Sequence, residues 1–329
     1  ILTPNNQTVR TAEVEQPQVQ TPLEGTLSMS ETFGFTPRRI DVGETTSVVV
    51  GTLGELCRVD SRGELISPVC QPFPAPVTSG VILEDRWVGI WVEVEFQVAR
   101  MAALPLDDAW RDGIEREELR TVLRNDGLEA VPAASIWSRT LDSEPMALTR
   151  VGDGFAFAVL GRGIYLMDAD ANEIWRAAIP NVGVDGSQRL HRQILEMFVI
   201  GDVLQIWMED AEVYEMSLDD GRIIDQRVIR LSDRLEAVFH SKHLGWLLAL
   251  SGGGIVRFES LDSAPDIHPT AGPVIDAVEG DCGWVWTGWR HDGMLVDDGV
   301  VSRPRRELGV AVLADSVLTN DGTWSACLV

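Results

Sequence analysis

Apolar and polar residues alternate in short runs along most of the chain, and the runs are separated by turns rich in Asp and Gly. The clearest copy of this pattern contains three consecutive runs, Phe155–Leu160, Gly163–Asp168 and Glu173–Ala177. Alternation with a period of two residues, interrupted by turn residues, predicts short antiparallel strands. The pattern recurs about seven times at a spacing of about 40 residues, which is the size of one four-stranded propeller blade.

We therefore predict an all-β fold, a seven-bladed β-propeller. Six or eight blades are the alternatives, because the second repeat unit is ambiguous. The last unit, Gly309–Val329, has room for only three strands. We expect Gly25–Phe35 to pair with this unit as its fourth strand, because ring closure removes exposed sheet edges.

Residues 1–24 are rich in Thr, Pro, Gln and Asn and have no helical period. We predict that they form a flexible tether and that the propeller spans residues 25–329. A tether of this kind typically follows an export signal or a lipid anchor, and the chain begins at Ile1. We expect export to the periplasm, the cell surface or the exterior, with tethering through the N-terminus. An ordinary disordered terminus of a cytoplasmic protein is the alternative.

An insertion at residues 106–124 breaks the repeat inside the second unit. Its sequence predicts an amphipathic helix, which Asp107 or Asp108 would cap and in which Trp110 and Ile114 begin an apolar stripe. Three roles are open for this stripe: packing on its own blade, docking of a partner, or covering the axial channel as a lid. We expect removal of the insertion to leave a folded ring with weaker association.

The chain has 51 acidic and 27 basic residues, which gives a formal net charge of -24. A surface of this sign repels phosphate groups, so we expect neither nucleic acid nor an anionic membrane as a partner. No apolar run reaches the ~18 residues that a membrane-spanning helix requires.

Tryptophan recurs at a similar depth in successive units, at Trp91, Trp207, Trp246 and Trp286. We predict that these side chains pack between neighbouring blades, because large aromatic side chains fill the space between twisted sheets. The densest aromatic and polar stretch follows Trp286. We expect Trp289, Arg290, His291 and Asp292 to lie in one turn, where they would bind a sugar or a peptide side chain. An ordinary polar hairpin is the alternative.

Cysteine and histidine spacing indicates no metal site. Cys57 and Cys70 flank a predicted hairpin turn, and their spacing permits a disulfide as readily as two buried thiols. The chain has no Cys-x-x-Cys motif or His/Cys cluster of the kind that binds zinc. We predict neither a metal nor a cofactor.

The segment Met167–Arg176 resembles the quinoprotein-type (PQQ-like) repeat, which reads Leu-Asp-x-x-x-Gly-x-x-x-Trp, and Ser217–Ile224 is a weaker second match. At the level of the fold the units are also WD40-like. Asn172 stands where the repeat usually has Gly, and a Trp docking motif does not recur regularly. The resemblance implies a propeller and, with these departures, a non-catalytic relative such as the assembly-factor and scaffold propellers.

The sequence contains no nucleophile elbow, zinc-protease motif or phosphate-binding loop. We therefore predict a non-enzymatic scaffold that mediates protein–protein interaction or assembly. The alternative is an enzyme, or a propeller that binds a carbohydrate or a quinone at its axial mouth. A pair of buried carboxylates with shifted pKa values near the axis would favour that alternative.

Overall fold

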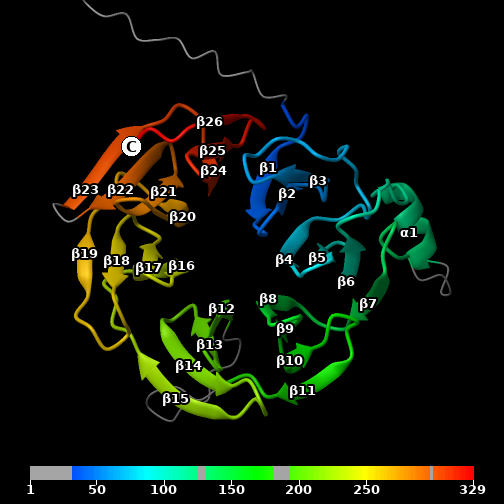
Figure 1. Cartoon of the computed structure of the whole chain (residues 1–329). Helices are drawn as coiled ribbons and strands as arrows, with labels where there is room; N and C mark the ends of the chain where they lie inside the picture. The colour runs from blue at the N-terminus through cyan, green and yellow to red at the C-terminus, as the bar shows by residue number, and fades with distance from the viewer. Residues whose placement is uncertain (1–31, 125–129, 181–192, 297–298) are drawn as a thin grey trace, which may run out of the picture. The chain divides into compact units, whose positions relative to one another are not determined.

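The computed structural model describes residues 32–124, 130–180, 193–296 and 299–329. These residues form 26 β-strands in seven antiparallel sheets and one short α-helix (Figure 1). Each sheet is one blade, and within a blade every strand pairs with the strand that precedes it in the sequence. The predicted seven-bladed, all-β architecture is confirmed.

Five blades have four strands. Blade 2 contains β4 (Val77–Ile82), β5 (Arg86–Glu93), β6 (Val98–Pro105) and β7 (Trp137–Leu141). Blade 3 contains β8 (Pro145–Val151), β9 (Gly154–Val159), β10 (Gly163–Met167) and β11 (Glu173–Ala177), and blade 4 contains β12 (Ile194–Ile200), β13 (Val203–Met208), β14 (Glu212–Ser217) and β15 (Ile223–Val228). Blade 5 contains β16 (Leu235–Ser241), β17 (Gly245–Leu250), β18 (Ile255–Phe258) and β19 (Asp266–His268), and blade 6 contains β20 (Val274–Gly280), β21 (Gly283–Gly288), β22 (His291–Val296) and β23 (Gly299–Pro304).

Two blades have three strands among the described residues. Blade 1 contains β1 (Pro37–Asp41), β2 (Thr46–Gly51) and β3 (Leu56–Asp60), and blade 7 contains β24 (Gly309–Leu313), β25 (Ser316–Thr319) and β26 (Trp324–Ala326). The backbone N–H of Phe33 donates to the carbonyl oxygen of Gly322, so the chain enters blade 1 alongside blade 7. Most of the predicted closing strand, residues 25–31, lies outside the described residues, and the closure stays a prediction.

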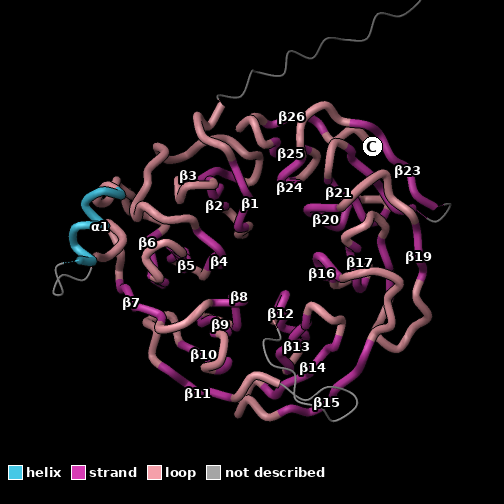
Figure 2. The backbone as a smooth tube through the Cα atoms, turned by 180° about the vertical axis from the view of Figure 1, so that it is seen from behind, coloured by secondary structure: helices cyan, strands magenta, loops and turns pink. Residues whose placement is uncertain are grey.

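The first strand of each blade lies nearest the axis of the ring. Each of these strands contacts the first strands of the two neighbouring blades, and β24 of blade 7 contacts β1 of blade 1 (Figure 2). All seven first strands shift register after their first residue, where a β-bulge inserts one extra residue. A bulge increases the local twist of a strand, and here it recurs at the narrowest part of every blade.

Apolar clusters of buried side chains fill the spaces between neighbouring blades. They lie between blades 1 and 2, 2 and 3, 3 and 4, 4 and 5, 5 and 6, and 7 and 1. Trp91, Trp207, Trp246 and Trp286 are all buried and belong to such clusters. The predicted packing role of these four tryptophans is confirmed.

The turns between the second and third strands of the blades share one backbone feature. Each of the seven contains a residue with positive φ, in chain order Gly54, Gln97, Gly161, Ala211, Gly253, Arg290 and Gly322. Because consecutive strands are antiparallel and the first strands are equivalent around the ring, these seven turns lie at the same end of the propeller. We call this end the turn face and define it by residues 52–55, 94–97, 160–162, 209–211, 251–254, 289–290 and 320–323.

Candidate functional site

The Trp289–Asp292 segment divides into two exposed and two buried residues. Trp289 is 59% exposed and Arg290 is also exposed, whereas His291 and Asp292 are buried. The prediction that all four lie in the turn is wrong for His291 and Asp292. Strand β21 continues to Gly288 and β22 begins at His291, so that only Trp289 and Arg290 form the turn.

Asp292 lies at the centre of a buried polar network between blades 6 and 7. Its carboxylate pairs with the guanidinium of Arg305 and accepts a hydrogen bond of 2.8 Å from the Thr287 hydroxyl. It also accepts the backbone N–H of Leu328 at 3.1 Å. Arg305 in turn donates to Ser325 and, at 2.9 Å, to the carbonyl oxygen of Ala326. This network fixes β26 and the residues after it against blade 6, so we call it the blade 6–7 latch.

His291 fills the space behind the exposed turn. Its Nδ1 lies 3.2 Å from the carbonyl oxygen of Trp289, and its ring lies against Gly288. A Cβ at Gly288 would approach the Pro273 carbonyl oxygen to 2.2 Å and the His291 Cε1 to 2.9 Å. The imidazole therefore supports the turn from below, and its position does not offer it to a ligand on the surface.

The inserted segment also differs from its sequence prediction. The helix α1 spans Arg116–Arg124 and begins eight or nine residues after the predicted caps. Asp108 accepts only the N–H of Ala109, in a local turn. The reason is that residues 106–115 are held in a non-helical path by tertiary contacts, in which Gly113 donates its backbone N–H to the Gln71 carbonyl oxygen at 2.9 Å. In the described ranges, no helix is long and apolar enough to cross a membrane.

Trp110 and Ile114 face the protein core. Trp110 is 4% exposed, donates its indole N–H to the carbonyl oxygen of Pro105 and stacks beneath the guanidinium of Arg58. Ile114 is partly buried against the same apolar cluster, to which Leu119 of α1 also belongs. Of the three uses proposed for the stripe, the structure shows packing on the protein's own blades.

Helix α1 is fastened to the turn between β5 and β6. Arg116 forms ion pairs with Glu93 and Glu95, and Arg120 forms one with Glu95 at 3.1 Å. The guanidinium groups of both arginines also lie over the ring of Phe96. The helix lies at the outer edge of the ring in both views, so the proposed lid over the axial channel is wrong (Figures 1 and 2). Its contacts with 93–96 place it beside the turn face.

Cys57 and Cys70 are buried free thiols and do not form the disulfide considered above. Cys70 is paired with Leu56 in the sheet, so Cys57 is one residue out of register with it. Successive side chains of a strand point to opposite faces. Accordingly, Cys70 packs between blades 1 and 2 and Cys57 between blades 7 and 1. Burial raises the pKa of both thiols to about 12.

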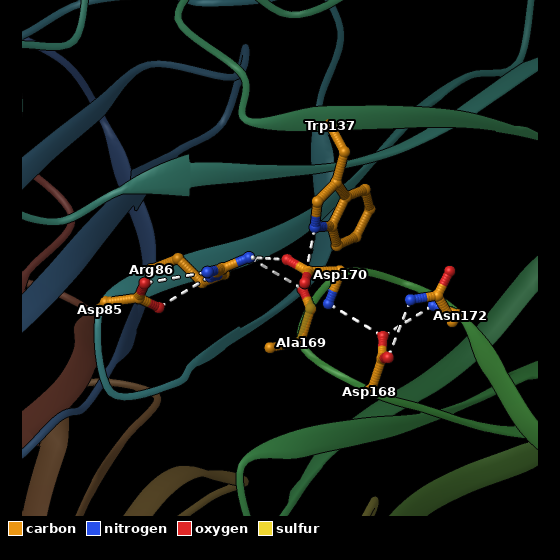
Figure 3. A network of polar contacts seen from close by, with 7 residues as sticks. All are labelled: Asp85, Arg86, Trp137, Asp168, Ala169, Asp170 and Asn172. Carbon is orange, nitrogen blue, oxygen red and sulfur yellow. Dashed lines mark hydrogen bonds and ion pairs between the residues drawn. The ribbon is translucent and has the colours of Figure 1, made fainter.

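The segment that resembles the quinoprotein repeat forms a self-bonded turn between β10 and β11 (Figure 3). The Asp168 carboxylate accepts the backbone N–H groups of Asp170 and Asn172 and the side-chain amide of Asn172. These hydrogen bonds lower the pKa of Asp168 below its usual value, and the one from the Asn172 side-chain amide contributes most. The residue thus acts as a turn former, as its sequence position predicts.

The same turn receives two donors from blade 2. Arg86 donates to the carbonyl oxygen of Ala169 at 3.1 Å and to the Asp170 carboxylate at 2.8 Å, and Trp137 donates its indole N–H to the Ala169 carbonyl oxygen at 2.9 Å (Figure 3). The next pair of blades repeats the arrangement, since Trp175 of β11 donates to the carbonyl oxygen of Leu218 at 2.6 Å. Blade 2 therefore docks on blade 3, and blade 3 on blade 4, through a tryptophan of the outer strand. This repeated contact was not predicted from the sequence.

Two carboxylates on first strands have raised pKa values. Burial raises the pKa of Glu196 on β12 to about 7 and that of Asp276 on β20 to about 6. Both residues directly follow the bulge of their strand. Blade 5 separates them, and Asp276 accepts the backbone N–H of Val312 in blade 7 at 2.8 Å. They are therefore two separate carboxylates, and not the shared pair that would favour an enzyme.

A cleft of about 480 Å³ opens at the opposite end of the ring from the turn face. It is lined by residues of the β1–β2 turn, of β4 and of Arg150 on β8, and it includes the carboxylates of Asp41 and Glu44. The Asp41 carboxylate is already bonded to the Trp87 indole at 2.7 Å and to the Arg39 guanidinium at 2.9 Å. Carboxylates of blade 1 and the Arg150 guanidinium of blade 3 thus meet at this cleft, and blade 2 contributes Gly80, Val81 and Ile82 to its lining. In the described ranges, no group of three His, Cys, Asp or Glu side chains has the geometry of a metal site.

The turn face carries apolar tips that sequence reasoning missed. Val94 in the β5–β6 turn is 80% exposed and Leu53 in the β2–β3 turn is 63% exposed. With Trp289, three of the seven turns present a large apolar side chain to solvent. The exposure of Leu53 could have been predicted, because it stands between Thr52 and Gly54 in a turn where polar residues are usual.

No protein-family model matches the chain, and no curated protein matches it. Solved structures with a similar fold include the WD40 β-propeller domain of Doa1, with a TM-score of 0.59 and 8% identity over 90% of this chain and 93% of that chain. BamB from Moraxella catarrhalis matches with a TM-score of 0.54 and 12% identity over 90% of this chain and 84% of its own. The computationally designed Ika8 protein has a TM-score of 0.53 and 11% identity, over 92% and 98%. At these identities, the likenesses show that the chain has the β-propeller fold.

Proposed function

We propose that this protein is a non-enzymatic β-propeller scaffold that binds a partner protein through its turn face. The observation that carries the proposal is the exposure of Val94, Leu53 and Trp289 at the tips of three turns on that face. Apolar patches rimmed by polar residues are typical of protein-binding surfaces, and Leu53 and Val94 lie on adjacent blades. Helix α1, fastened beside the β5–β6 turn, adds an exposed charged surface next to Val94.

The test is a comparison of affinity capture from an extract of the source organism. The turn-face variant carries Leu53→Ser, Val94→Ser and Trp289→Ser. The matched control carries Ile174→Ser, Ile224→Ser and Ile267→Ser, three exposed apolar residues on outer strands. We expect the wild-type protein and the control to capture a common protein at least tenfold more than the turn-face variant does. Reconstitution of the complex with that purified protein, measured by calorimetry, completes the test.

Equal capture by all three proteins would contradict the proposal, and so would a loss confined to the control variant. Surface substitutions of this kind usually change stability by less than ~0.5 kcal/mol, so all three proteins should unfold at nearly the same temperature. A thermal melt of each protein checks this before the capture experiment.

The cleft beside Asp41, Glu44 and Arg150 supports a second candidate function, the binding of a small polar ligand such as a carbohydrate at the axial mouth. The supporting observation is the convergence of oppositely charged groups from blades 1 and 3 on one cleft. Thermal shift measurements with a panel of mono- and oligosaccharides test it. A stabilisation that Arg150→Ala removes would support this function, and the absence of any shift at millimolar sugar would contradict it.

A further inference from the structure

Three exposed arginines lie in the Trp289 turn and in the neighbouring end of β23 and the residues after it, at the blade 6 edge of the turn face. Arg290 forms the turn with Trp289, Arg303 lies opposite Asp292 in the β22–β23 ladder near the end of β23, and Arg306 follows that strand. The Arg290 side chain donates through Nε to the carbonyl oxygen of Arg306 at 3.1 Å, and the Arg305 N–H donates to the carbonyl oxygen of Arg290. The turn and the segment after β23 therefore form one continuous surface.

This surface has a charge opposite to that of the chain as a whole. The chain has nearly twice as many acidic as basic residues, with a formal net charge of -24. Nevertheless, among the described residues no acidic side chain forms an ion pair with Arg290 or Arg303. Arg306 has one distant partner, Glu307 at 3.9 Å, and its side chain is 91% exposed. The three guanidinium groups are thus available to an anionic group from outside.

The backbone at Arg290 is unfavourable for an arginine. Arg290 has a φ of 61°, and four of the six equivalent turns place glycine at the residue with positive φ. A side chain in this conformation is disfavoured, because its Cβ lies too close to the following carbonyl oxygen. Non-glycine residues held in such conformations concentrate at functional sites. In this turn the conformation places an arginine beside an exposed tryptophan.

The blade 6–7 latch holds this surface from below. Asp292, which follows the turn, and Arg305, which lies between Arg303 and Arg306, are buried and paired with each other. The backbone that carries the exposed arginines is therefore fixed before a ligand binds. Binding groups that are fixed in advance lose less conformational entropy on association.

We propose that Trp289, Arg290, Arg303 and Arg306 form a recognition site for an acidic peptide segment of the partner protein. Guanidinium groups bind carboxylates with two parallel hydrogen bonds, and the indole face of Trp289 would stack on an aromatic or aliphatic side chain of the same segment. The acidic remainder of the propeller surface would repel such a segment and direct it to this site. This inference rests on the proposed function, because it specifies the chemistry of the partner at one edge of the turn face.

The experiment selects peptides from a phage-displayed library of random 12-residue sequences on the full-length protein. We expect the selected peptides to be enriched in Asp and Glu together with an aromatic residue. Fluorescence anisotropy then measures their affinity for three proteins. We expect Arg290→Glu/Arg303→Glu/Arg306→Glu to bind at least tenfold more weakly than wild type, and the affinity for wild type to fall as the salt concentration rises.

A matched control keeps the same change in net charge elsewhere. It carries Arg139→Glu/Arg176→Glu/Arg222→Glu, which alters exposed arginines on the outer strands of blades 2 and 3 and in the β14–β15 turn, all outside the turn face. We expect this control to bind the peptides as tightly as wild type. Trp289→Ala, which leaves the charge unchanged, should weaken binding at least fivefold.

Three outcomes would overturn the inference: selection of neutral or basic peptides, equal affinities for the two triple variants, or tighter binding of phosphatidylglycerol vesicles than of acidic peptides. The capture test with the Leu53, Val94 and Trp289 substitutions separates this failure from failure of the proposed function. If a variant with only Leu53→Ser and Val94→Ser loses the partner while the arginine variant keeps it, the turn face binds a partner but the arginines do not recognise it.

Discussion

Ala314 adopts a backbone conformation that two equivalent turns give to glycine. The turns between the first and second strands of blades 3 and 4 contain Gly152 and Gly201, with φ of 56° and 59°, whereas blade 7 has Ala314 with φ of 50°. Ala314 is exposed, so its methyl group makes no buried contact that would offset the strain. The strain is therefore a local cost of the alanine side chain.

We expect Ala314→Gly to raise the free energy of unfolding by about 0.5–1 kcal/mol, because relief of strain exceeds the added flexibility of the unfolded chain. Urea unfolding followed by tryptophan fluorescence measures the change. The reverse substitution, Gly152→Ala, has open space for its Cβ and serves as the control. It should lower stability by a similar amount, and an unchanged midpoint in both variants would show that the conformation costs nothing.

Asp276 makes the stability of the ring depend on pH. Burial raises the pKa of Asp276 to about 6 in the folded protein, above its usual value of 3.8. The folded state therefore holds this proton over a pH range in which the unfolded state has lost it. Protonation of Asp276 therefore contributes to the stability of the folded state. This contribution is fully present below pH ~4 and is lost as the pH rises through about 6.

We expect Asp276→Asn, which keeps an acceptor for the Val312 N–H, to remove this dependence. Between pH 4 and pH 8 the free energy of unfolding of the wild-type protein should fall by on the order of 1–2 kcal/mol relative to that of the variant. This value is smaller than the pKa shift alone would give, because Asp276 is partly exposed to solvent. Urea unfolding at both pH values measures the difference. Asp315→Asn, at an exposed position, provides the control, and parallel curves for wild type and Asp276→Asn would refute the expectation.

At the scale of single elements, α1 belongs to the core of the protein although it lies at the rim of the ring. Leu119 has no exposed surface and packs in the cluster that contains Trp87, Trp91 and Trp110. The sequence predicted a dispensable insertion. The structure instead argues that loss of residues 106–124 would expose the cluster between blades 1 and 2.

Leu119→Ala tests this role without deleting the segment. It should lower the free energy of unfolding by about 2–5 kcal/mol, the usual cost of truncating a fully buried leucine. Glu118→Ala, one residue earlier and exposed, should change it by less than ~0.5 kcal/mol. Chemical denaturation of both variants provides the comparison. If the two variants have the same stability, α1 is a peripheral appendage.

Strands were easier to predict than the helix. The Phe155–Leu160 run needed only its period of two and the flanking glycines, and the structure places β9 at Gly154–Val159. The start of the helix depended on tertiary contacts instead. Asp107 and Asp108 have the chemistry of helix caps, yet Trp110 enters the core and Gly113 bonds to Gln71. These contacts keep the segment non-helical as far as Glu115.

The candidate site was predicted in part for a related reason. A short distance in the sequence indicated that Trp289, Arg290, His291 and Asp292 belong together, but it did not indicate which side chains point inward. That depends on Arg305, thirteen residues beyond Asp292, which draws the carboxylate into the interface. The basic residues at 303–306 are evident in the sequence, but their proximity to the Trp289–Arg290 turn follows only from the pairing of β23 with β22.

For the whole molecule, the seven interfaces between blades are not equivalent. Six contain an apolar cluster, and the interface between blades 6 and 7 contains the blade 6–7 latch and the hydrogen bond from Val312 to Asp276. Apolar contacts are tolerant of small shifts, whereas a buried ion pair needs one defined geometry. The number of blades could be predicted because each repeat is local, but this difference between interfaces could not, because it joins residues of different repeats.

The blade 6–7 latch has a consequence for the order in which the chain acquires its structure during synthesis. Leu328, which donates to Asp292, lies 36 residues further along the chain. At a ribosomal rate of about 5–20 residues per second, Asp292 emerges roughly 2–7 s before that donor. During this interval the polar face of blade 6 has no neighbour to complete it. The growing protein is therefore an open arc until blade 7 joins blade 6 to blade 1.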